Sequence, residues 1–328
     1  MKKEVPSNEG TLLQTSFDYL LTMDKLSFLF LSCLYLLITL VASTGPIDPT
    51  TQIVVSASLI ALLGIPHGAI DHIIFLEESK VQPLHFYLFY FSLIGLYAMG
   101  WIVFPTISLI FFLLLSAFHF GQSQFSEFAS IPQKTKFLLN FTWGCSILSG
   151  LVIYNMEEII HHSKSSLDLN QLLAAFDENI YTIILLATSL LTIFLLLFSL
   201  SKKYLTVEQF FRELFTLAII HISFFIMPVL VGFTLYFVIL HSVRVLNEEF
   251  VYLKNRQKCR SILDFVRLLF PYTSISIIGC IIILYGININ IINISYTLLL
   301  LIFISSLTLP HSIVMNDFYK KFGQGSKL

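Results

Sequence analysis

Residues 180–200 read IYTIILLATSLLTIFLLLFSL and contain no charged residue. A helix that crosses the hydrocarbon core of a bilayer needs about 20 predominantly apolar residues, so this stretch predicts a transmembrane helix. Pro105 and Pro228 each lie between two apolar stretches. If one or both of them only kink a single long helix, the chain has nine or eight transmembrane helices. Otherwise the apolar stretches predict ten spans, at residues 26–44, 52–75, 85–103, 105–121, 137–154, 180–200, 211–229, 231–246, 270–287 and 292–313.

The composition of the 328-residue chain supports the same class. Charged residues make up 12% of it, against roughly 25% in a soluble domain. The net charge of −1 argues against nucleic acid as the main partner. The four cysteines form no C-x-x-C pair, which argues against a disulfide framework or a thiolate zinc site. We therefore predict an all-α, polytopic integral membrane bundle of about ten transmembrane helices.

The basic residues predict the orientation of the chain, because short cytoplasmic loops of membrane proteins carry an excess of Lys and Arg. With the N-terminus inside, every lysine and arginine except Lys164 falls on the inner side. This predicts cytoplasmic termini and a multi-pass protein of the cell membrane. We expect a polar cytoplasmic segment at 1–25, one transmembrane domain at 26–313 and a cytoplasmic tail at 314–328.

Several histidines are predicted to lie at membrane depth, where ionisable groups are costly and indicate a functional site. Five of them, on four separated spans, fall in the inner halves of those spans: His67, His72, His119, His241 and His311. Neutral imidazoles that converge in a dry site suit Zn, Cu, Fe or Ni. Metal-bound histidines usually donate their second N–H to a carboxylate or carbonyl. Asp71, one helical turn after His67, is placed for that role.

For the other four histidines we predict structural or surface roles. His221 lies near mid-span on a helix of the opposite direction, which indicates a helix-to-helix hydrogen bond. His85 is expected at the membrane interface. His161 and His162 lie in an acidic outer loop, where we expect a solvated pair.

Four short motifs surround the intramembrane histidines. They are PHGAID at 66–71, HFG at 119–121, HSVR at 241–244 and PH at 310–311. In this order on a helical membrane chain, they resemble the bacteriorhodopsin-related-protein-like family of β-carotene 15,15′-dioxygenases. The resemblance covers about residues 50–313. It implies a membrane non-haem iron enzyme that splits β-carotene at its central double bond with O₂ and gives two molecules of retinal.

The resemblance also implies roles for single residues. His67, His119 and His241 would bind Fe²⁺, and His311 or His72 would supply a fourth ligand. β-Carotene or a related carotenoid, O₂ and membrane lipid are the expected partners. Asp71 would act in the catalytic site by orienting an imidazole.

Three positions depart from the family's pattern. Val245 stands where the family has the second histidine of H-S-x-R-H, one turn after His241. Gln124 and Asn316, the latter next to Asp317, stand where acidic residues are expected. Because of these changes, the alternative is a divergent paralogue that binds carotenoid or assists assembly without catalytic turnover.

Two further functions also use histidines inside a membrane. A proton- or metal-coupled transporter would relay or carry an ion on them, but it predicts internal repeats, and the sequence has no convincing repeat. A bis-histidine haem electron carrier would show a Soret band.

Overall fold

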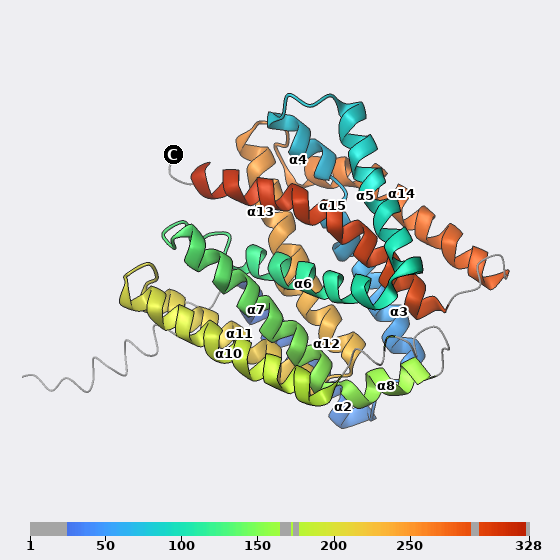
Figure 1. The fold of residues 1–328 in the computed structure, drawn as a ribbon, viewed down its shortest axis with the longest axis vertical. Coiled ribbons are helices and arrows are strands. Elements are labelled where there is room, and N and C mark those ends of the chain that lie inside the picture. The colour runs from blue at the N-terminus through green and yellow to red at the C-terminus, as the bar shows by residue number, and fades with distance from the viewer. Residues whose placement is uncertain (1–24, 165–171, 173–176, 290–294, 326–328) are drawn as a thin grey trace, which may run out of the picture.

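The computed structural model describes residues 25–164, 172, 177–289 and 295–325, which form a helical bundle (Figure 1). This part of the chain contains no strand, and ten of its helical segments are long and apolar enough to cross a membrane. The predicted all-α membrane fold is therefore confirmed. The main elements are α2 (Lys25–Thr44), α3 (Pro49–Leu59), η1 (Ile60–Gly64), η2 (Ile65–Gly68), α4 (Asp71–Glu78), α5 (Pro83–Val103), α6 (Pro105–Gln124), α7 (Gln133–Tyr154), α8 (Met156–Lys164), α10 (Glu178–Ser201), α11 (Val207–Ile226), α12 (Val229–Leu235), η3 (Tyr236–Ser242), α13 (Val243–Asn255), α14 (Ile262–Asn288) and α15 (Tyr296–Gly325).

Proline and capping side chains set several helix starts. Pro105 is the first residue of α6, which Phe104 separates from α5, and Pro228 is the N-cap of α12. Proline is favoured at the first turn because the N–H that it lacks has no partner there. At the start of α11, Thr206 and Gln209 form a capping box. Pro105 and Pro228 thus separate two helices in each case, and the alternative of eight or nine spans is wrong.

Two of the spans are not continuous α-helices. The second span runs from α3 through the π-helical η1 and the 3₁₀-helical η2 into α4. The eighth span runs from α12 through the π-helical η3 into α13. Single π-helical turns are rare and occur frequently at functional sites. His67 lies in η2 and His241 lies in η3, so both irregular segments carry a predicted site residue.

Helix α6 packs between α7 and α15, and α10 and α11 pack against α7 (Figure 1). At the crossing of α6 and α7, a Cβ atom added at Gly144 would lie 1.8 Å from the carbonyl oxygen of Ala117. A Cβ atom at Gly121 would lie equally close to the carbonyl oxygen of Asn140. Only glycine allows the two backbones to approach this closely. This crossing fixes the position of α6, which carries His119.

The outer helices leave large apolar side chains exposed. Leu88 and Ile102 on α5 and Phe270 on α14 are more than half exposed. Such a surface is unfavourable in water and is suited to lipid contact. Large side chains such as Trp143 and Phe125 fill the interior instead.

Helix α15 continues into the segment predicted as a tail, since it ends at Gly325. Val314, Met315 and Phe318 are buried there in an apolar cluster. The predicted N-terminal segment, except for Lys25, lies outside the described residues, as do 326–328. The cytoplasmic orientation of both termini stays a prediction.

Candidate metal centre

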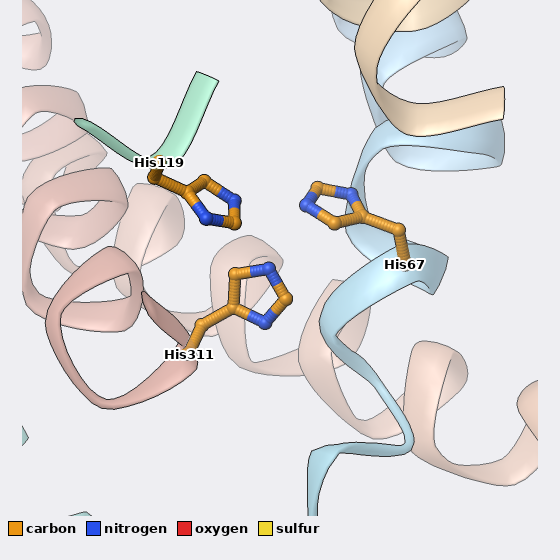
Figure 2. Close-up of side chains that lie close together, drawn as sticks. All are labelled: His67, His119 and His311. Atoms are coloured by element: carbon orange, nitrogen blue, oxygen red, sulfur yellow. The ribbon is translucent and has the colours of Figure 1, made fainter. Parts of the chain in front are cut away.

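Three histidines from separate spans meet inside the bundle (Figure 2). His67 comes from η2, His119 from α6 and His311 from α15. All three are buried, and each offers a ring nitrogen such that these nitrogens lie within 4.8 Å of one another. In Figure 2 the three rings surround a common space. Two nitrogens that each lie about 2.0–2.1 Å from one metal are at most about 4.2 Å apart, so a small movement of the rings would bring the three nitrogens around one ion.

The backbone before His67 departs from α-helical geometry and carries the ring into the bundle. The π-helical η1 is followed by η2, in which Pro66 has no N–H to donate. The carbonyl oxygen of Gly64 accepts a hydrogen bond from Nδ1 of His67. This bond leaves Nε2 of His67 as the nitrogen for a ligand.

Several ring nitrogens of the cluster are buried without a hydrogen-bond partner. They are both nitrogens of His119, Nε2 of His241 and Nε2 of His311. Buried polar atoms are nearly always paired, and each unpaired one costs about 1–3 kcal/mol. A metal ion would bind one lone pair on each of these rings, and neutral imidazoles suit a first-row divalent metal. The donor set therefore fits a metal, and it fits iron.

Asp71 is hydrogen-bonded to His311 and not to His67, its neighbour in the sequence. Nδ1 of His311 donates to Asp71, at 2.9 Å from Oδ1 and 3.1 Å from Oδ2. The hydroxyl of Tyr90 donates to Oδ2 of the same carboxylate at 2.8 Å. A histidine that donates to a carboxylate has a fixed tautomer and is a more basic ligand. Asp71 thus leaves Nε2 of His311 unprotonated toward the cluster.

Replacing Asp71 with asparagine is expected to lower the affinity for Fe²⁺ by about 10–100-fold, because His311 loses its charged acceptor. Titration of the full-length protein in detergent with Fe²⁺ under anaerobic conditions measures this. Tyr90→Phe, which removes only one donor to the same carboxylate, is the control and should have a smaller effect. Equal affinities of D71N and the wild type would contradict the role of Asp71.

His241 contacts the cluster through its ring. The ring centroid lies 5.2 Å from that of His67 and 4.9 Å from that of His119. Its Nδ1 is hydrogen-bonded to the Ser123 hydroxyl at 2.9 Å, and Phe237 stacks on the ring. His241 is not among the three residues whose nitrogens all lie within 4.8 Å of one another. The geometry thus places His311 where the resemblance implied His241, with His241 beside the three.

The comparison with known families identifies the chain. A family model described as Beta-carotene 15,15'-dioxygenase matches residues 58–319, which include the three clustered histidines and His241. The chain belongs to this family. The resemblance carried by the four motifs is thereby confirmed. No curated protein and no solved structure matches the chain.

Val245 occupies the position at which the family resemblance expects a second histidine, and its side chain is apolar. Val245 is fully buried in a cluster that includes Ile70, Val314 and Met315. Its side chain offers no ligand atom. In this dioxygenase family member, the histidine on α15 raises the number of imidazoles at the site to four.

The two other departures take part in side-chain hydrogen bonds, of which that of Gln124 is buried and that of Asn316 is partly buried. Nε2 of Gln124 donates to Oε2 of Glu213 at 2.5 Å, and Nε2 of Gln122 donates to Oδ1 of Asn316 at 2.9 Å. A carboxylate is therefore present beside position 124, but α11 supplies it. Arg212 balances its charge at 3.2 Å.

The remaining histidines lie outside the cluster. His72 contacts the ring of Tyr272, with centroids 4.4 Å apart, and offers no ligand to the site. Nε2 of His221 is hydrogen-bonded to the Ser146 hydroxyl at 3.0 Å, which confirms the predicted helix-to-helix bond. His85 and His161 are exposed, and the side chain of His162 is outside the described part.

Proposed function

We propose that the protein is a non-haem iron dioxygenase of the cell membrane that cleaves β-carotene at its central double bond with O₂. The products would be two molecules of all-trans-retinal. The observation that carries the proposal is the set of unpaired, buried imidazole nitrogens on His119 and His311, close to His67, in a chain of the dioxygenase family. Imidazole ligands without cysteine are compatible with Fe²⁺.

The reaction breaks one C=C bond and places one oxygen atom of O₂ on each new aldehyde. It therefore consumes no proton and no external reductant. Bound Fe²⁺ supplies the redox activity that O₂ needs for reaction with a closed-shell alkene. His67, His119 and His311 would hold the ion, with His241 as the additional ligand. Asp71 holds the proton of His311 on Nδ1.

Aromatic side chains give the cluster an apolar wall. The Phe237 ring lies 5.6 Å from the rings of both His67 and His241, and Phe233 stacks on Phe237 at 5.4 Å. Phe120 lies 4.9 Å from His241. These rings exclude water and offer a surface on which a polyene can pack. A carotenoid dissolved in lipid would reach this wall without crossing water.

Expression in a bacterial host that accumulates β-carotene tests the proposal. We expect the colour of the cells to fade and retinal to appear, with one ¹⁸O atom in each retinal when the cells receive ¹⁸O₂. Cells with an empty vector control for spontaneous loss of carotenoid. Stable colour and no retinal, from protein that is present in the membrane and loaded with iron, would refute the dioxygenase.

A second candidate is a carotenoid-binding or assembly protein of this family without turnover. The buried Val245 favours it, because an imidazole expected from the resemblance is missing there. This candidate predicts that carotenoid co-purifies intact with the protein and that the purified protein contains no iron.

A further inference from the structure

Glu249 on α13 is a buried acidic side chain with no hydrogen-bond partner. Its exposed fraction is 0%, and both carboxylate oxygens are unpaired. Among the described residues, the charged side chains that interact with it are Asp71 and Glu248, which are acidic as well. A buried carboxylate costs several kcal/mol unless a proton, a cation or hydrogen-bond donors compensate it. Since the described residues supply neither a hydrogen bond nor a cation, Glu249 either holds a proton or takes up a cation from outside the protein.

The other buried glutamates near the histidines have partners of their own. Glu213 accepts a hydrogen bond from Gln124 and lies 3.2 Å from the guanidinium of Arg212. Glu248 accepts from the Ser126 hydroxyl and interacts with Arg244. Glu249 differs from both, because its oxygens accept no hydrogen bond and no cation is among the described groups that interact with it. The Tyr319 hydroxyl interacts with Glu249 without a hydrogen bond to it.

Glu249 lies between the histidine cluster and one end of the bundle. It interacts with Asp71, which is hydrogen-bonded to His311. On the other side, Tyr252, one turn after Glu249, interacts with Glu77 near the end of α4. Glu77 pairs with the half-exposed Lys258 at 3.2 Å. Ile74 of α4 and Leu253 of α13 belong to one buried apolar cluster, so the two helices that carry these acidic groups share a core.

The acidic groups Glu77, Glu249 and Asp71 form a series that leads from the predicted cytoplasmic surface to the histidine cluster. Glu249 follows His241 by eight residues, which is about 12 Å along a helix. A metal centre that is buried in a membrane protein needs an entry path. A hydrated divalent cation does not cross the lipid-facing side, and carboxylate oxygens are ligands that hard cations accept.

We propose that Glu249, together with Asp71, is a transit site through which Fe²⁺ passes from the predicted cytoplasmic side to the histidine cluster. The proposal rests on the iron centre of the proposed function. The cation would compensate the charge of Glu249 for the time of passage, and Asp71 would pass it on to the imidazoles. Glu249 would not be a ligand of the bound ion, so it would affect how fast the centre fills and not how tightly it holds the metal.

Uptake of Co²⁺ by the full-length protein in detergent tests this step. The protein is stripped with a chelator, and stopped-flow absorption then follows the rise of the visible bands that imidazole ligation gives to Co²⁺. We expect Glu249→Gln, which keeps the shape and removes the charge, to slow the uptake severalfold with an unchanged final absorbance. Glu213→Gln is the matched control, because it neutralises a buried glutamate that already has a cation, and it should fill at the wild-type rate.

The outcomes separate this proposal from the function on which it rests. If the wild type takes up Co²⁺ and E249Q fills equally fast, Glu249 is merely protonated and the transit site is refuted while the metal centre stands. A lower final absorbance in E249Q would also refute it, since Glu249 would then hold the bound metal or the fold. Glu249→Asp retains the charge and should fill faster than E249Q, which keeps the test decisive if E249Q is poorly folded. If the wild type binds no Co²⁺, the metal centre itself fails.

Discussion

Retinal formation is expected to disappear when His119 is replaced with alanine. Both ring nitrogens of His119 lack hydrogen-bond partners, so the substitution breaks no bond within the protein. What it removes is a ligand from the three nitrogens that lie within 4.8 Å of one another. The loss should exceed the roughly 10–100-fold that removal of an outer hydrogen-bond partner costs. Retinal is measured by chromatography of extracts from β-carotene-accumulating cells.

His72→Ala is the matched control for this experiment. His72 is predicted from the sequence at the same depth, but it contacts Tyr272 and lies outside the cluster. It should leave retinal formation near the wild-type level. Equal activities of H119A and H72A would mean that the cluster does not carry the chemistry.

Replacement of Gly144 with alanine should have the second largest effect, although this residue lies on α7, outside the cluster. The new methyl group would lie 1.8 Å from the carbonyl oxygen of Ala117, two residues before His119. Because a backbone atom is in the way, α6 must move. Overpacking of this kind costs about 1–3 kcal/mol, and the movement would displace His119 from His67 and His311. We expect a lower melting temperature in detergent and a loss of retinal formation.

Gly95→Ala controls for the exchange of glycine in a membrane helix. No atom lies within 4 Å of a Cβ added at Gly95. This variant should match the wild type in melting temperature and in activity. If G144A behaves like G95A, the close crossing of α6 and α7 is not required for the site.

The transmembrane helices could be predicted because the apolar residues of each one are sufficient to recognise it. Residues 180–200 are apolar over the thickness of a bilayer, and the structure has α10 at Glu178–Ser201. The approach of His67, His119 and His311 could be expected as well, because they share a depth and the direction of their spans. The depth and the direction of a span follow from its length and its order along the chain, and a sequence contains both.

The arrangement within the cluster could not be predicted, since it depends on irregular backbone. The π-helical turns η1 and η3 rotate the residues that follow them, and periodicity in the sequence does not indicate where such turns occur. This is why the order of His241 and His311 around the centre differs from the expectation.

Hydrogen bonds between side chains of distant segments could not be predicted from the sequence either. Asp71 is one turn from His67 in sequence, yet it binds His311 and accepts from Tyr90. Gln124 replaces an expected acid, and Glu213 on another helix supplies a carboxylate beside it. Such pairs depend on which helices pack together, and a single sequence does not specify that.

The iron content of the purified wild-type protein, measured beside that of the double variant His67→Ala, His119→Ala, decides whether these imidazoles hold the metal. We expect one ferrous ion per wild-type chain and none in the variant, with the same helical circular dichroism in both. Iron retained by the folded double variant at the wild-type level would show that the metal is bound elsewhere and would contradict the proposed centre.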